Sequence, residues 1–336
     1  MATHAAPLPG DTGETPPKRR LGERWLSPLM LAPSVVALIV FIYGFIGMTF
    51  WISISQWRKA GPMDLAITDP VWGVYDRLFN DRRFQIDLRN TVIFTILFLL
   101  LAVGVGLLLA ILLDRHIFGG SVFRNIFLFP YALSFIVTGV SWRWIFNPDS
   151  GLNLLVDHLG VNWLLDKMGL GPFHPGWLTN PSVYGDLPVP AFIKAQIGFP
   201  AALWPVIIAA VWQLSGFAMA MYLAGLGTIS NDVREAAALD GASSWRMYRD
   251  IIIPLLKPIT ISTLIILGHV SLKIFDLIFA MSGTGPGFAT DVPGIYMFEQ
   301  TFKATRYNLG AAASVVMLLL VSIVIIPYLA RSLKDL

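Results

Sequence analysis

Three ionisable residues, His269, Lys273 and Asp276, stand inside an apolar run in the last third of this 336-residue chain. If the run is one helix, a rotation of 100° per residue places the three within about 60° on one face. Because a charged side chain at the centre of a membrane span costs roughly 2.5–3.5 kcal/mol, that face should contact protein or water. Two kinds of chemistry fit: hydrogen bonding to a solute that crosses the membrane, or a local Lys273–Asp276 ion pair that joins two helices.

A second apolar run, 201–227, carries further candidates for contact with a solute: Trp212, Gln213 and Phe217. An amide in a span needs a hydrogen-bond partner, which makes Gln213 the stronger candidate. The aromatic rings either pack between helices or offer flat apolar surfaces to a bound molecule. Arg143, between two tryptophans, is expected to extend toward the membrane surface.

Several other chemistries are excluded by residue types that are missing. The chain has no cysteine, so disulfides, thiolate metal sites and a cysteine nucleophile are excluded. Its five histidines form neither an HxxxH nor an HExxH pair, and no metal site is predicted. No GxxxxGK[ST] sequence is present to bind ATP. The net charge of +3 is mild and no basic stripe is visible, so no nucleic-acid partner is expected.

The composition is that of a membrane protein: 55% hydrophobic and 13% charged, where soluble domains carry roughly 25% charged residues. A bilayer core requires roughly 20 apolar residues per helix, and backbone in lipid must form its hydrogen bonds within the segment. We therefore predict an all-α, polytopic membrane protein with six transmembrane helices. The predicted spans are about 29–54, 90–113, 123–146 (interrupted by Pro130 and by Arg143), 201–227, 259–281 and 307–330.

The segments outside these spans suggest the domain organisation. Residues 1–24 are polar and are predicted to be a disordered tail, followed by one transmembrane domain over 25–336. The basic residues favour a cytoplasmic location for both termini. The segment 147–200 is then an external cap, and 228–258 is a cytoplasmic loop with a helical pattern.

That cytoplasmic loop reads as two short helices joined at a corner. Asp232 is a candidate N-cap with Glu235 as its capping-box partner, and Gly241 suits the left-handed position that ends a helix. Ser243 or the serine after it can cap the second helix. Pro254 and the proline at 258 should disrupt this helix where it returns to the bilayer.

The first helix of this loop has a surface of small residues, which lets a partner's backbone approach closely, and a charged edge that includes Arg234. An amphipathic helix that lies on the membrane surface is the alternative interpretation. A match to a family signature favours a docking surface for a partner protein over a helix on the membrane. The loop resembles the EAA motif of binding-protein-dependent ABC importer permeases. The matching residues are Glu235, Ala236, Ala237, Asp240, Gly241, Ala242, Ile251, Ile253 (where leucine is usual) and Pro254.

The resemblance covers roughly residues 25–336 and is nearest to sugar permeases of the maltose and glycerol-phosphate type. It departs from them in a longer outer loop at about 185–200. The segments that carry it are 130–146, Gly151-Leu152-Asn153, Trp177-Leu178, Phe275-Asp276 with Gly283-Thr284-Gly285-Pro286, and 310–313.

The resemblance implies a type I importer permease in the cytoplasmic (inner) membrane of a bacterium or archaeon. This subunit would form half of a sugar path and would itself catalyse no reaction. Its implied partners are a second homologous permease, two cytoplasmic ATPases that hold ATP and Mg²⁺, an external sugar-binding protein, and lipid. The implied coupling residues are those of the EAA motif; Trp212, Gln213, Phe217, Lys273 and Asp276 remain the candidates for the path. A permease for another solute, a proton-coupled carrier, and a channel or scaffold are the alternatives.

Overall fold

The computed structural model describes residues 21–114, 119–187 and 190–332. The chain divides into two compact units, Met1–Met48 and Thr49–Leu336. The first contains α1 (Leu21–Leu38), the π-helix η1 (Ile39–Gly44) and the beginning of α2 (Phe45–Ser53). Residues 1–20 of the expected tail lie outside the described residues, whereas 21–24 form the first turn of α1.

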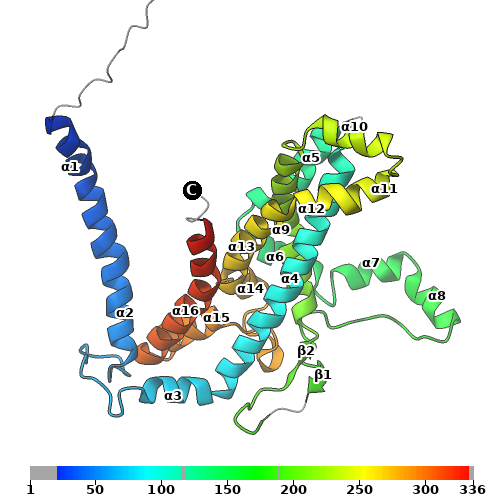
Figure 1. Ribbon diagram of the computed structural model, residues 1–336. Helices are drawn as coiled ribbons and strands as arrows, with labels where there is room; N and C mark the ends of the chain where they lie inside the picture. Colours follow the sequence, from blue (N-terminus) through cyan, green and yellow to red (C-terminus); the bar gives the residue numbers. More distant parts are fainter. Residues whose placement is uncertain (1–20, 115–118, 188–189, 333–336) are drawn as a thin grey trace, which may run out of the picture. The chain divides into compact units, whose positions relative to one another are not determined.

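The described part of the second unit consists mainly of helices, with one antiparallel hairpin and an isolated bridge between Ser55 and Ile67 (Figure 1). Its elements are α3 (Gly73–Asn80), α4 (Arg82–Asp114), α5 (Gly120–Leu128), η2 (Phe129–Ala132), α6 (Phe135–Ile145), α7 (Leu152–His158), α8 (Val161–Lys167), β1 (Val183–Leu187), β2 (Ile197–Pro200), α9 (Leu203–Leu226), α10 (Asn231–Leu239), α11 (Ser244–Met247), η3 (Tyr248–Ile252), α12 (Ile253–Leu255), α13 (Lys257–Leu272), α14 (Asp276–Met281), η4 (Pro286–Phe288), α15 (Pro293–Phe298), η5 (Glu299–Lys303) and α16 (Tyr307–Ser332).

Among the described residues, four helices are long and apolar enough to cross a membrane: Met30–Ser53, Arg82–Asp114, Leu203–Leu226 and Tyr307–Ala330. Two further candidates are bent pairs. Gly120–Ala132 meets Phe135–Ile145 at 99°, and Ser244–Leu255 meets Lys257–Leu272 at 63°. If each pair is one span, the total is six, as the hydropathy predicts.

Two predicted spans differ from the structure. The second begins at Arg82 instead of 90, because polar turns extend the helix beyond its apolar part. The fifth does not continue to 281: α13 ends at Leu272, and α14 begins at Asp276. The chain turns at this break so that Ile274 enters the core while Lys273 stays exposed. The expectation that His269, Lys273 and Asp276 share one helix face was therefore wrong.

The bend in the third span follows the expected interruption near Pro130. The short helix η2 contains this proline, and Ser134 then begins α6 by accepting a hydrogen bond from the Val137 backbone N–H at 3.2 Å. A proline cannot donate a backbone hydrogen bond within a helix, which favours a break at this place.

Glycines allow the closest contacts between the spans. A Cβ on Gly106 of α4 would overlap Ala218 and lie 2.9 Å from the Met219 backbone nitrogen of α9, whereas one on Gly104 would meet nothing within 4 Å. A Cβ on Gly216 would overlap the Phe127 carbonyl group. Gly106 and Gly216 thus bring backbones together, as small residues do in membrane helices.

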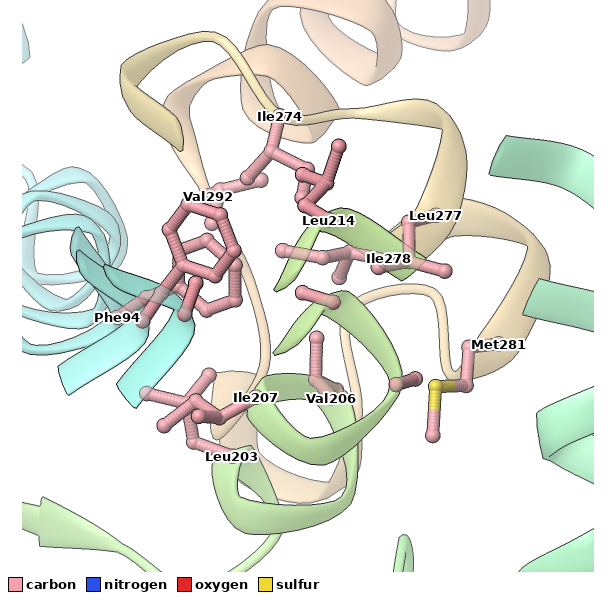
Figure 2. Packing of buried hydrophobic residues seen from close by; sticks show 14 of the residues in the cluster. Phe94, Leu203, Val206, Ile207, Leu214, Ile274, Leu277, Ile278, Met281 and Val292 are labelled. Atoms are coloured by element: carbon pink, nitrogen blue, oxygen red, sulfur yellow. The ribbon is translucent and has the colours of Figure 1, made fainter. Parts of the chain in front are cut away.

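The largest core cluster joins α4, α9 and the segment 274–292. Figure 2 shows Phe94, Leu214, Ile274, Leu277 and Val292 from these elements pointing toward one another, and all are buried. This core fixes α9, whose two ends lead to the hairpin and to α10.

The segment 147–200 contains α7, α8 and the hairpin, and none of its described residues belongs to a candidate span. The α7 sequence LNLLVDHLG is repeated in kind by VNWLLDKMG in α8. Each half ends on a glycine with positive φ, Gly160 at 72° and Gly169 at 74°. This nine-residue repeat explains why the two short helices are alike in length.

Candidate functional site

The segment 228–258, which we call the rim segment, begins with α10. Ser230 occupies the N-cap position in an extended conformation, although its side chain accepts no capping hydrogen bond. The prediction that Asp232 is the cap was wrong, because the helix starts one residue before it. Asp232 instead lies in the first turn, where the helix dipole favours a carboxylate.

The end of α10 is a Schellman turn built on Gly241. The Gly241 backbone N–H donates to the Ala238 carbonyl at 3.0 Å, and the Ala242 N–H donates to the Ala237 carbonyl at 3.0 Å. Gly241 has φ +76°, a conformation that is unfavourable for any residue with a Cβ. The predicted left-handed glycine is confirmed.

The second half of the rim segment returns to the bundle. Ser243 caps α11 by accepting a hydrogen bond from the Arg246 backbone N–H at 3.4 Å, which settles the choice between the two candidate serines. A π-helical stretch, η3, follows, and the chain bends by 63° at Leu256, between Pro254 and the proline at 258. The predicted disruption of this helix is confirmed.

Most of α10 is open to solvent. Glu235, Ala236 and Asp240 are exposed, whereas Ala237 is buried against the rest of the chain. Leu239 is 88% exposed and Trp245 is 70% exposed. Sequence reasoning did not select these two apolar residues, although their position beside the motif was a usable signal. Leu239 ends α10 and Trp245 lies on α11, so exposed apolar side chains stand beside the charged ones on both helices, as at protein interaction sites.

Arg234 does not form part of this exposed edge, contrary to the prediction. Its Nη1 donates to Asp114 Oδ2 at 2.7 Å, at the end of α4. This hydrogen bond raises the pKa of the Arg234 guanidinium, so the residue stays charged. The rim segment is therefore tied to a transmembrane helix by an ion pair.

Trp212 and Phe217, two candidates in α9 for contact with the solute, pack against different aromatic residues. Trp212 packs edge to face against Trp142, with ring centroids 5.6 Å apart. Both indoles line an apolar groove of about 470 Å³ at the bend of the third span. Phe217 stacks on Tyr131 at 5.3 Å.

Gln213 has a structural partner at the same bend. Its Nε2 donates to the Leu133 carbonyl at 2.8 Å, which is a carbonyl that the break between η2 and α6 leaves outside a helix. Its buried Oε1 accepts no hydrogen bond from any residue that the structure describes. The Nε2 group of this amide thus stabilises the bend.

Lys273 and Asp276 flank the break between α13 and α14, and both are exposed. No ion pair joins them in the described part of the chain, although the local pair was one expected alternative. Lys273 lies at the C-terminal end of one helix and Asp276 in the first turn of the next, where the helix dipoles favour these charges. Non-helical backbone at membrane depth is tolerated where it faces protein or water.

The rim segment and the helices α9 and α13 lie within a region that matches a known protein family. Residues 102–334 match the model of the family described as "Binding-protein-dependent transport system inner membrane component". The match covers more than half of the chain and includes the whole rim segment. This chain is a member of that family of permeases.

Curated relatives of this permease agree with the assignment. It is 36% identical to a protein named as a probable ABC transporter permease of Pyrococcus horikoshii, over 91% of this chain and 95% of the relative. It is 34% identical to a xylose/arabinose import permease of Haloferax volcanii, over 89% and 86%. It is 31% identical to a trehalose/maltose permease of Thermococcus litoralis, over 93% and 95%.

The fold of the permease is also similar to a solved structure. A chain of a bacterial ABC transporter that imports the polysaccharide alginate aligns with TM-score 0.68 over 93% of this chain and 97% of that one. The two are 21% identical, so this likeness concerns the fold.

At the other end of α4, away from the rim segment, the permease buries a charge cluster. Arg83 Nε donates to Asp291 Oδ2 at 2.6 Å, and Arg83 Nη2 lies 2.7 Å from Glu299 Oε2. Asn90 Nδ2 donates to the Asp291 carbonyl at 2.9 Å. Burial raises the pKa of the Tyr296 hydroxyl, which donates to Asp81 at 2.8 Å. This Arg83 cluster joins α4 to the segment 288–299.

The motif Trp177-Leu178 and the motif Gly283-Thr284-Gly285-Pro286 both border an open cavity of about 590 Å³. Trp177 Nε1 donates to Asn153 Oδ1 at 2.9 Å, and Asn153 Nδ2 donates to the Pro175 carbonyl at 3.2 Å. The cavity is lined by Arg143, by Leu178 and by residues 282–286. Motifs that are about 100 residues apart in sequence therefore form one surface of the permease.

Proposed function

We propose that this chain is a permease subunit of an ATP-driven, binding-protein-dependent sugar importer and that α10 is its coupling helix. The observation that carries the proposal is the exposed α10, which bears the EAA residues and is closed by the left-handed Gly241 turn. Family membership supports the transport role. The relatives named for xylose, arabinose, trehalose and maltose support a sugar as the substrate.

The proposed docking surface consists of Glu235, Ala236, Ala238, Leu239 and Asp240. These residues are exposed, so the groove of a cytoplasmic ATPase can receive them. Ala237, Gly241, Ala242 and Pro254 act by shaping the segment. ATP and Mg²⁺ are held by two partner ATPases, and this subunit catalyses no reaction itself.

A second, homologous permease completes the sugar path in this proposal. An external sugar-binding protein delivers the substrate to the end opposite α10, and the solved alginate transporter in complex with its periplasmic protein supports such a partner. Both termini and α10 then lie in the cytoplasm, and the chain resides in the cytoplasmic membrane of a bacterium or archaeon. The external cap is 147–200.

Sugar contacts are proposed for Trp212, Gln213, Phe217, Lys273 and Asp276. Aromatic faces suit the apolar faces of a sugar ring, and the amide and charged groups suit its hydroxyls. The exposed break that carries Lys273 and Asp276 supports a polar wall of the path. Labelled-sugar uptake by a strain in which only this chain is deleted, with and without the chain restored, identifies the sugar.

The coupling role is tested at Gly241. Proline cannot adopt φ +76°, so Gly241→Pro should abolish sugar uptake and the ATPase stimulation by the loaded binding protein. Gly241→Ala strains the turn by about 1–2 kcal/mol and should reduce uptake about tenfold. Sugar binding to the external protein should persist in both variants.

Gly169→Ala is the matched control, since Gly169 has φ +74° and, like Gly241, open space around its Cα. It introduces the same strain outside the rim segment and should leave coupling intact. Uptake that survives Gly241→Pro would refute the coupling role.

A further inference from the structure

Asp114, the last residue of α4, accepts hydrogen bonds from two side chains of the rim segment. Arg234 Nη1 donates to Asp114 Oδ2 at 2.7 Å, and the Tyr248 hydroxyl donates to the same oxygen at 2.8 Å. The side chains of Arg234 and Asp114 are 23% and 16% exposed, and Tyr248 is buried. One carboxylate therefore connects three elements: α4, α10 and η3.

The position of this carboxylate gives the contacts their strength. A negative charge at the C-terminal end of a helix is opposed by the helix dipole, and the last turn of α4 contains no basic residue. Arg234 supplies the compensating charge from outside the helix. Hydrogen bonds between ionised partners are about twice as strong as neutral ones, and loss of one partner leaves the other charge poorly solvated.

The elements on either side of this contact differ in how firmly they are held. Within the described part of α10, Ala237 is the buried residue, and the exposed face is free to follow a partner. By contrast, α4 is fixed to α9 through the close approach at Gly106. The connections that flank α10 contain Gly227 and Gly241. Without a side-chain contact between α10 and α4, these connections could change conformation when α10 moves, and α4 would stay in place.

We propose that Asp114 is the positioning residue through which a displacement of α10 moves α4. With Arg234 and Tyr248 it keeps α10, η3 and the end of α4 together as one body. A pull on the exposed face of α10 is then transmitted to the α4–α9 pair. The inference rests on the proposed coupling role of α10, and it adds the link that carries the movement into the membrane.

A charge exchange in the assembled, reconstituted transporter tests this link. The readout is the number of sugar molecules transported per ATP hydrolysed, because a loss of protein alone would not change that ratio. Arg234→Asp and Asp114→Arg, each alone, should lower the ratio at least about tenfold, since each places like charges together. The double variant exchanges the two charges and should return the ratio to within about threefold of the original. Tyr248→Phe removes one hydrogen bond and should lower the ratio about two- to threefold.

A cross-link separates failure of the link from failure of the proposed function. The chain has no cysteine, so Leu239→Cys introduces a single thiol on the exposed face of α10, to be cross-linked to a cysteine placed in the ATPase groove. The cross-link should form in all the charge variants. If it fails to form with Asp114 and Arg234 unchanged, the coupling role itself is wrong. If it forms but the single variants keep the normal ratio, or the double variant does not regain it, the link through Asp114 is refuted and the coupling role stands.

Discussion

Arg83 contacts two acidic side chains and an aromatic ring. Its guanidinium neutralises the fully buried Asp291 and the partly buried Glu299, and it lies over the Phe288 ring, 4.8 Å from the centroid. Asp87 is also fully buried nearby. Removal of Arg83 would leave the buried Asp291 without its cation, whereas Glu299 would keep Lys303 at 2.8 Å.

We expect Arg83→Met to destabilise the folded chain by about 3–5 kcal/mol, because it breaks a buried ion pair from one side. The measurement is thermal unfolding of the purified protein in detergent. Arg82→Met is the matched control: Arg82 is the adjacent residue, it is exposed, and no described ion pair includes it. Equal unfolding temperatures for the two variants would show that the Arg83 cluster contributes little.

The sequence contained the signal for some of these residues and not for others. Gly241 could be predicted because a helix C-terminus has a local requirement for positive φ. The partners of Arg234 and Arg83 could not, because Asp114 and Asp291 are 120 and 208 positions away in sequence. Gln213 was expected to need a partner, but only the fold shows that this partner is the Leu133 carbonyl.

At the scale of elements, the contact between α4 and α9 depends on one of two neighbouring glycines. Gly106→Ala should destabilise the protein by about 1–3 kcal/mol, because the added methyl group would overlap Ala218. Gly104→Ala should be neutral or stabilising by up to about 1 kcal/mol, since alanine favours a helix and the site is open. The unfolding temperature should therefore fall for Gly106→Ala and stay unchanged or rise for Gly104→Ala. A fall of the same size in both would contradict the close packing.

The transmembrane segments could be predicted from the sequence because hydropathy is a local property of each run. The bends and the break could be predicted only in part. Pro130, Pro254 and the proline at 258 indicated the two bends. No proline or glycine marks the break after Leu272; there the burial of Ile274 decides, and burial depends on α4 and α9.

At the scale of the whole molecule, the proposed orientation requires the two ends of α4 to face different compartments. Figure 1 shows α10 and α11 at one end of α4 and α9, with α3 and the hairpin at the other. Tyr184 on the hairpin is 60% exposed, and Leu239 on α10 is 88% exposed. These two residues are suitable probes because substitution there disturbs no packing.

We expect Tyr184→Cys to react with a membrane-impermeant thiol reagent in intact spheroplasts, and Leu239→Cys to react only in inverted vesicles from which the ATPase has been removed. The parent chain has no cysteine and provides the blank. The reverse labelling pattern would show that α10 lies outside the cell, where no ATPase can bind it, and would refute the proposed orientation.

The length of α4 has a consequence for how the bilayer meets this protein. Its 33 residues rise about 50 Å, whereas hydrocarbon is about 30 Å thick. An upright α4 therefore projects roughly 20 Å beyond the acyl chains in total, and a tilted one projects less. The first turns of α4, from Arg82 to Asn90, are polar and are therefore the part expected to extend beyond the hydrocarbon. Arg83 and its acidic partners then lie, inside the protein, at the depth of the lipid headgroups, and a thicker membrane would place them at the depth of the hydrocarbon.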